Sequence, residues 1–191
     1  MKNALVILAG GKGTRFHHKI PKQFHELGNK NMINIILSNI DSQLFNWIVL
    51  SISKSYRNSV KNYPEYNKIK DKIIFSEPGK TRQKSSFNAL KKINYKNIKN
   101  VLIHDGARPF CSNNLIKKIL KENKKGKNVV PFIEYNDRQI LRNSTKDIKV
   151  INIQTPQAFD YQLILSAHKK LKKLEFSDDS GLLQKLNHKI S

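Results

Sequence analysis

The 191-residue sequence holds a single cysteine, Cys111, and no long run of apolar residues. One cysteine excludes an intramolecular disulfide framework and favours a reducing compartment. No apolar stretch approaches the roughly 20 residues that a membrane-spanning helix needs. The first apolar run, Ala4 to Ala9, is too short for a signal peptide, and glycine and basic residues follow it at once. We therefore expect a cytoplasmic protein with no membrane partner.

Acidic residues are scarce: 14 Asp and Glu stand against 36 Lys and Arg, which gives a formal net charge of +22. Such an excess raises nucleic-acid binding as a hypothesis. However, only six of the basic residues are arginine, the lysines are spread along the chain, and no aromatic residues are interleaved with them as on a base-stacking surface. The composition indicates a basic surface that attracts small anions, with no dedicated nucleic-acid partner.

Short apolar runs alternate with segments whose apolar residues recur every three or four positions. The runs predicted as strands are 4–9, 47–52, 72–76, 100–105 and 128–133, and the predicted helices are 31–44, 82–93 and 112–124. Continuous apolar runs are typical of strands buried on both faces. The pattern predicts one α/β domain over 1–191, with a Rossmann-like, mostly parallel sheet and helices on both faces. Ser112 or Asn113 is the expected N-cap of the last helix.

Two segments depart from this alternation. Residues 134–150 predict an excursion from the sheet, as a hairpin or protruding arm. Residues 177–191 predict a helix followed by the start of another strand. Because ligands bind at the carboxyl ends of the strands in such sheets, residues 9–15, 77–82, 104–110 and 134–138 are expected to share one rim.

The stretch LAGGKGTRF at 8–16 predicts a phosphate-binding loop of an uncommon kind. It lacks the spacing of a Walker loop, and Phe16 stands where the dinucleotide fingerprint needs a glycine. Gly10, Gly11 and Gly13 let backbone N–H groups approach an anion closely. A tight turn with solvated basic residues is the alternative interpretation of these glycines.

Five segments resemble, in order, the signature of the sugar-phosphate nucleotidylyltransferases, and within them the cytidylyltransferases that act on methylerythritol phosphate. The segments are LAGGKGTRF with PKQF, PGKTRQKSSFNAL (78–90), VLIHDGARPF (101–110), TPQAF (155–159) and SDDSGLL (177–183). The resemblance implies that CTP is attacked at its α-phosphorus by the phosphate of a polyol phosphate, with pyrophosphate leaving. It also implies Mg²⁺ as cofactor and a homodimer formed through the arm at 134–150.

The resemblance also implies the residue roles. Arg15 and Lys22 are the expected catalytic cations, which stabilise the transition state. The implied nucleotide-binding residues are Ala9, Gly10, Gly11, Gly13, Gly79, Arg82 and Ser85. Asp105 and Arg108 are implied on the acceptor side, with Asp105 also holding Mg²⁺.

Alternatives remain for several of these residues. Ser85 is equally well explained as a helix-turn residue, Asp105 as a turn residue and Arg108 as a partner in a rim salt bridge. His104 is expected to pack or hydrogen-bond and not to act as a base, because the attacking phosphate is already anionic. Thr155 and Pro156 are expected to fix the chain geometry.

The match is weakest in the excursion. The resemblance implies a threonine in this segment, but its sequence, NDRQILRN, has none and carries Arg138 near that place. The resemblance also implies an arginine at position 147, where this sequence has Asp147. A strand and lysine-bearing loop of the family are expected beyond residue 191. Ribitol 5-phosphate or another sugar phosphate as acceptor, and a non-catalytic nucleotide- or RNA-binding protein, are the alternative functions.

Overall fold

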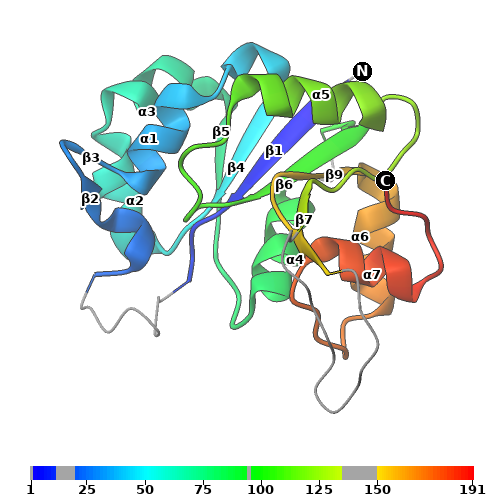
Figure 1. The fold of residues 1–191 in the computed structure, drawn as a ribbon. Helices are drawn as coiled ribbons and strands as arrows, with labels where there is room; N and C mark the ends of the chain where they lie inside the picture. The colour runs from blue at the N-terminus through cyan, green and yellow to red at the C-terminus, as the bar shows by residue number, and fades with distance from the viewer. Residues whose placement is uncertain (1, 12–19, 94–95, 135–149) are drawn as a thin grey trace.

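A five-stranded sheet forms the centre of the protein (Figure 1). The computed structural model describes residues 2–11, 20–93, 96–134 and 150–191. The strand order is β5 (Ile73–Ser76), β4 (Trp47–Ser51), β1 (Asn3–Leu8), β6 (Asn100–Asp105) and β9 (Gln157–Asp160). The first four strands are parallel, and β9 runs antiparallel to β6. The prediction of an α/β fold with a mostly parallel sheet is confirmed.

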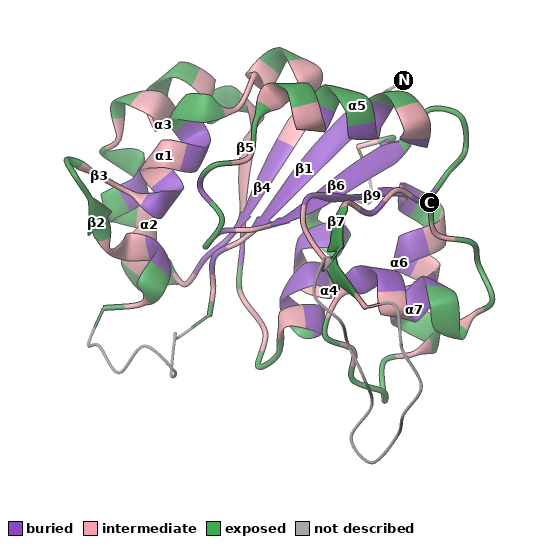
Figure 2. Ribbon diagram, in the orientation of Figure 1, coloured by how far each residue is buried: buried purple, intermediate pink, exposed green. Residues whose placement is uncertain are grey.

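Helices cover both faces of the sheet, as predicted. One face carries α1 (Met32–Asn39), α2 (Lys54–Lys61), α3 (Pro64–Ile69) and α5 (Asn113–Asn123), and the other carries α4 (Arg82–Lys92), α6 (Tyr161–Lys170) and α7 (Asp179–Lys185). Successive side chains of a strand point to opposite faces. Leu5 and Ile7 therefore join the core under α1 and α5, whereas Ala4 and Val6 join the core under α4 and α6. Figure 2 shows the central strands buried between these two layers.

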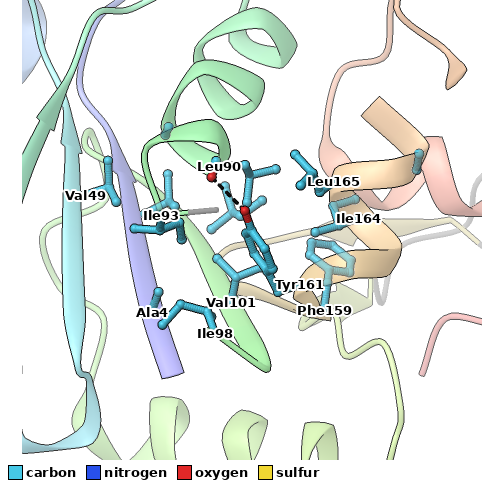
Figure 3. Close-up of a cluster of buried hydrophobic side chains, with 14 of the residues drawn as sticks. Ala4, Val49, Leu90, Ile93, Ile98, Val101, Phe159, Tyr161, Ile164 and Leu165 are labelled. Carbon is cyan, nitrogen blue, oxygen red and sulfur yellow. Dashed lines mark hydrogen bonds between the residues drawn. The ribbon is translucent and has the colours of Figure 1, made fainter. Parts of the chain in front are cut away.

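The core between the sheet and α6 includes a buried tyrosine (Figure 3). Tyr161 is 1% exposed, and its hydroxyl donates a hydrogen bond to the carbonyl oxygen of Leu90 at 3.0 Å. Phe159 and Ile164 pack in the same cluster. Because a buried hydroxyl without a partner would cost about 1–3 kcal/mol, this bond allows the ring to tie α4 to α6.

The ends of two helices show how local polar residues set their bounds. Ser112 accepts a hydrogen bond from the backbone N–H of Leu115 and is the N-cap of α5, as predicted. The helix predicted over 31–44 is too long, because α1 ends at Asn39. Asp41 then caps a separate 3-10 helix, η3 (Ser42–Leu44), by accepting from the N–H of Gln43.

The strand predicted over 128–133 is wrong as a continuous strand. Val129 bridges Ala158, and Asn128 bridges Ile190, but β7 (Phe132–Glu134) begins only after Pro131. Proline has no N–H to donate to a ladder, so it interrupts the pairing. β7 instead pairs antiparallel with β8 (Ile151–Ile153), which confirms a hairpin at the base of the predicted excursion. The rest of the excursion, 135–149, lies outside the described residues.

Remaining short elements complete the side near α1. They are the 3-10 helices η2 (Lys22–Phe24) and η4 (Lys70–Lys72) and the two-residue strands β2 (Glu26–Leu27) and β3 (Lys30–Asn31). Within the described ranges, no helix has the length and apolar character that crossing a membrane requires.

The strand order reverses between β1 and β6. The chain adds β4 and β5 on one side of β1 and then crosses to add β6 on the other side. In open α/β sheets, ligands bind outside the strand ends at such a reversal. Ala9 and Asp105 lie at this point, because Leu8 pairs with Asp105 in the sheet register.

Candidate active site

The glycine loop after β1 is held by a buried amide from the PKQF segment. Gln23 is 5% exposed, and its Nε2 donates hydrogen bonds to the carbonyl oxygen of Ala9 at 2.5 Å and to that of Gly11 at 3.0 Å. Both carbonyls are thereby turned toward Gln23. Sequence reasoning missed Gln23, whose only signal was its place inside the PKQF motif, next to Lys22.

Gly10 is required by its contact with the loop after β5. A Cβ built on Gly10 would lie 2.0 Å from the Cβ of Pro78, whereas one built on Gly11 would meet nothing within 4 Å. Only glycine lets the backbones of residues 9–11 and 77–79 approach this closely. The structure thus brings Ala9, Gly10 and Gly79 onto one rim, as predicted.

Ser85 fixes the shape of the second loop. Its hydroxyl accepts a hydrogen bond from the N–H of Gly79 at 2.9 Å and donates one to the carbonyl of Thr81 at 2.9 Å. Thr81 itself caps α4 by accepting from the N–H of Lys84. The helix-turn interpretation of Ser85 therefore describes its contacts, and its role toward a nucleotide stays a prediction.

Asp105 lies between two arginines at the end of β6. Its Oδ1 accepts from Arg82 Nε at 3.0 Å, and its Oδ2 accepts from Arg108 Nε at 3.3 Å. The side chain of Asp105 is 28% exposed, so it faces the rim. Arg108 also contacts the side chain of Gln154. The rim salt bridge that was the alternative for Arg108 is present, and its contact with an acceptor stays a prediction.

Arg82 also binds a second, fully buried carboxylate. Its Nη1 donates to Asp179 Oδ2 at 2.6 Å, and Asp179 is 1% exposed. Burial lowers the pKa of Arg82, but the charges of Asp179 and Asp105 outweigh it and raise that pKa. Burial by itself would raise the pKa of Asp179. The charge of Arg82 and the hydrogen bonds from His168 and Ser86 outweigh burial and hold this pKa well below its ordinary range. The contact of Arg82 with a nucleotide, implied by the resemblance, stays a prediction, and its pairing with Asp179 was not predicted from the sequence.

His104 is committed to packing and hydrogen bonding, as predicted. Its Nε2 donates to the carbonyl of Arg108 at 2.9 Å, since a carbonyl can only accept, and its Nδ1 then accepts from the hydroxyl of Thr155 at 2.9 Å. Thr155 in turn accepts from the N–H of Asp105 at 3.2 Å. Burial lowers the pKa of His104, which favours the neutral ring. These two hydrogen bonds link β6 to the segment at Thr155, which supports the predicted role of Thr155 in chain geometry.

Lys22 and Arg108 line one cleft beside this cluster. The cleft has a volume of about 590 Å³, and Thr155 and Gln154 also line it. Its walls are apolar side chains from separate segments: Leu27, Met32, Phe110, Phe132 and Ile133. Two cations in a cleft with apolar walls suit an anionic group attached to a small carbon skeleton.

Several predicted residues lie outside the described part of the chain. These are Gly13, Arg15, Arg138 and Asp147. Among the residues that are described, the structure joins Ala9, Gly10, Gly11, Gly79, Arg82, Ser85, Asp105 and Arg108 into one neighbourhood, with Lys22 on the adjoining cleft.

Comparison with known proteins identifies the family. The family model for 2-C-methyl-D-erythritol 4-phosphate cytidylyltransferase matches residues 3–191. The cytidylyltransferase of Thermosipho africanus is 35% identical, with 97% of this chain and 86% of that protein covered. A bifunctional IspD/IspF enzyme of Pelagibacter ubique is 37% identical over 100% of this chain. The match covers only about half, 51%, of that longer relative.

Solved structures agree with the sequence comparisons. A 4-diphosphocytidyl-2C-methyl-D-erythritol synthase from Anaerococcus prevotii superposes with a TM-score of 0.83 at 29% identity, with 100% of this chain and 85% of that one covered. The bifunctional IspDF of Campylobacter jejuni gives a TM-score of 0.82 at 29% identity, with 100% and 49% covered. The chain therefore belongs to the 2-C-methyl-D-erythritol 4-phosphate cytidylyltransferases, the nucleotidyltransferases that use CTP in isoprenoid precursor biosynthesis.

Proposed function

We propose that this chain itself transfers the cytidylyl group from CTP to 2-C-methyl-D-erythritol 4-phosphate and releases pyrophosphate. The observation that supports this most is the joining of two glycine-bearing loops to the Arg82–Asp105–Arg108 cluster at the switch point of the sheet. In this arrangement the triphosphate of CTP lies along the two loops, and the acceptor phosphate lies in the cleft that Lys22 lines. The two phosphates meet beside Asp105.

The reaction is an in-line displacement at phosphorus. An oxygen of the acceptor phosphate forms a bond to the α-phosphorus of CTP, and the bond from that phosphorus to the oxygen bridging the β-phosphate breaks. The attacking oxygen carries negative charge already, so no general base is needed. This fits His104, both of whose ring nitrogens are committed to the hydrogen bonds described above.

Catalysis then consists of positioning two anions and stabilising the charge that grows between them. We assign Lys22, and Arg15 by its place in the motif, to the charge on the α-phosphate. We assign Arg108 to the acceptor phosphate, which a guanidinium can bind with two parallel hydrogen bonds. Backbone N–H groups near Gly10 and Gly79 are assigned to the nucleotide.

Asp105 is the residue that suits Mg²⁺. Its carboxylate supplies hard oxygen ligands, and Mg²⁺ is commonly held by one or two carboxylates plus substrate phosphates. Among the described residues, no cluster of three or more His, Cys, Asp or Glu side chains offers a cage made by protein alone. One partly exposed carboxylate beside a triphosphate site fits an ion that arrives with the nucleotide, and this ion would neutralise phosphate charge.

A homodimer through the excursion is part of the proposal. Phe132, Ile133 and Ile151 belong to the hairpin base and are 50%, 59% and 45% exposed. By the register of the two strands, Phe132 and Ile151 share one face of the hairpin and Ile133 lies on the other, so both faces carry exposed apolar side chains that a second copy of the chain would cover. Phe132 and Ile133 also line the cleft, so this contact would close its open side.

Pyrophosphate release, measured with CTP, UTP, ATP and GTP against a panel of polyol phosphates, tests the activity. We expect release with CTP and methylerythritol phosphate together and with neither alone. Release with ribitol 5-phosphate only would assign a different acceptor to the same cleft. CTP binding without release for any acceptor would support the non-catalytic alternative.

A further inference from the structure

Asp179 begins α7 but does not serve as the cap of that helix. The preceding residue, Asp178, accepts from the N–H of Gly181 at 2.9 Å and satisfies the helix N-terminus. The carboxylate of Asp179 instead points into the protein and is 1% exposed. Helix capping therefore does not explain why an acid stands at position 179.

Three donors fix the orientation of this buried carboxylate. Arg82 Nη1 donates to Oδ2 at 2.6 Å, whereas Ser86 Oγ at 2.6 Å and His168 Nε2 at 2.9 Å both donate to Oδ1. A buried ion pair is often no more stabilising than apolar side chains of the same volume, because each charge must leave water. The cluster is better explained by the position that it gives to Arg82.

The Arg82 guanidinium connects the buried Asp179 to Asp105 at the rim. Its planar group holds Asp179 with Nη1 and Asp105 Oδ1 with Nε at 3.0 Å, so fixing one carboxylate fixes the approach to the other. The three residues are separated by 23 and 97 positions in the sequence. They join α7, α4 and β6 into one polar connection.

We propose that Asp179 is a positioning residue for the nucleotide-borne Mg²⁺, acting through Arg82 on Asp105. Arg82 holds Oδ1 of Asp105, so Oδ2 is the oxygen left to face the rim. Among the described residues, Oδ2 accepts a hydrogen bond only from Arg108 Nε, at 3.3 Å. When Arg108 turns to an acceptor phosphate, Oδ2 is presented in a fixed direction. The inference rests on the proposed role of Asp105.

The test is calorimetry of CTP binding over a series of MgCl₂ concentrations, without acceptor. We expect Asp179→Asn to raise the midpoint magnesium concentration about tenfold, as loss of an outer partner of a metal ligand commonly does. CTP affinity measured without magnesium should stay within about twofold of wild type. Thermal unfolding of each variant shows whether it is folded. If Asp179→Asn does not fold, Arg82→Lys replaces it in the test. Arg82→Lys should also raise the midpoint magnesium concentration about tenfold, because one ammonium cannot hold both carboxylates.

Two further variants separate positioning from a general loss of structure. Ser86→Ala removes one of the two donors to Oδ1 of Asp179, while His168 still holds Oδ1 and Arg82 still holds Oδ2, so this variant should keep the magnesium midpoint. In an Asp105→Asn background, Asp179→Asn should cause no further shift. An unchanged midpoint for Asp179→Asn in the wild-type background, or an equal shift in both backgrounds, overturns the proposal. If Asp105→Asn alone leaves the midpoint unchanged, the proposed metal role of Asp105 fails instead.

Discussion

The side-chain amide of Gln23 lies 2.5 Å from the carbonyl oxygen of Ala9 and 3.0 Å from that of Gly11. The carbonyls are thereby occupied, so the loop can present its N–H groups to an anion. This relationship explains why PKQF and LAGG occur together: the second motif holds the backbone of the first.

Replacing Gln23 should therefore weaken CTP binding through the loop. Gln23→Ala leaves a buried carbonyl without its donor, and Gln23→Glu cannot donate at all while ionised. We expect both variants to raise KM for CTP about tenfold and to lower the free energy of unfolding by about 1–3 kcal/mol. Steady-state kinetics and urea unfolding measure these effects, and Gln184→Ala on the exposed side of α7 is the control. A normal KM in Gln23→Ala would show that the loop keeps its shape without the amide.

Gly10 and Gly11 should respond in opposite ways to alanine. In Gly10→Ala the new Cβ meets the Pro78 ring at 2.0 Å, so the two loops must separate and the melting temperature should fall by several degrees. In Gly11→Ala the new Cβ meets nothing, so the melting temperature should stay close to wild type. Scanning calorimetry gives the comparison. Equal melting temperatures for the two variants would contradict the close approach at Gly10.

Asp179 should make folding stability depend on pH in the acid range. Its folded-state pKa lies well below its ordinary range, so the unfolded chain takes up this proton first as the pH falls. The stability that the carboxylate contributes is thus complete above its unfolded pKa of about 3.9 and is lost progressively below it. Asp179→Asn should cost about 3 kcal/mol at pH 7 and about 1 kcal/mol less at pH 3, because pH 3 lies about one unit below the unfolded-state pKa.

Urea unfolding of wild type, Asp179→Asn and Ser86→Ala at both pH values tests this dependence. Ser86→Ala keeps the carboxylate and should keep its pH dependence. A difference between wild type and Asp179→Asn that is the same at pH 7 and pH 3 would contradict the depressed pKa.

The sheet could be predicted from the sequence because its strands are continuous apolar runs. The predicted range 100–105 coincides with β6, and Ser112 caps α5 as its side chain suggests. Pro131 breaks a run that is equally apolar, because proline has no N–H to donate to the ladder. Periodicity and local caps thus predict elements better than they predict pairing.

Some residues of the candidate site could likewise be predicted from the sequence, and others could not. Asp105, Arg108 and the glycines could be located from their places after strands, since strand ends meet on one rim. Gln23 and Asp179 could not, because their roles depend on burial and on partners up to 97 residues away. The pairing of Arg82 with two acids likewise depends on the tertiary fold, which brings Asp179 at the start of α7 to Arg82 on α4, and no local pattern shows this.

The exposed hairpin base predicts a dimer that one charge should disrupt. Ile133 is 59% exposed beside Phe132 at 50%. In Ile133→Asp, a carboxylate would have to be desolvated in the interface, so sedimentation should show monomers at micromolar concentration where wild type is dimeric. Leu174→Asp alters an apolar side chain of similar exposure, 45%, that does not belong to the hairpin strands, and it should leave the dimer intact. Monomeric wild type at that concentration would refute the proposed homodimer.

Lys22 and Arg15 should affect turnover far more than CTP binding. Charge that develops on the α-phosphate is stabilised only in the transition state, so removing a cation there lowers kcat more than it raises the dissociation constant. We expect Lys22→Ala and Arg15→Ala each to lower kcat on the order of 100-fold or more. CTP affinity by calorimetry should change much less. Lys121→Ala on the exposed side of α5 removes one positive charge away from the rim and should turn over normally, which separates a local effect from the loss of net charge. Near-normal kcat in either site variant would remove that residue from the catalytic machinery, because a residue in contact with the developing charge cannot be lost without a rise in the barrier.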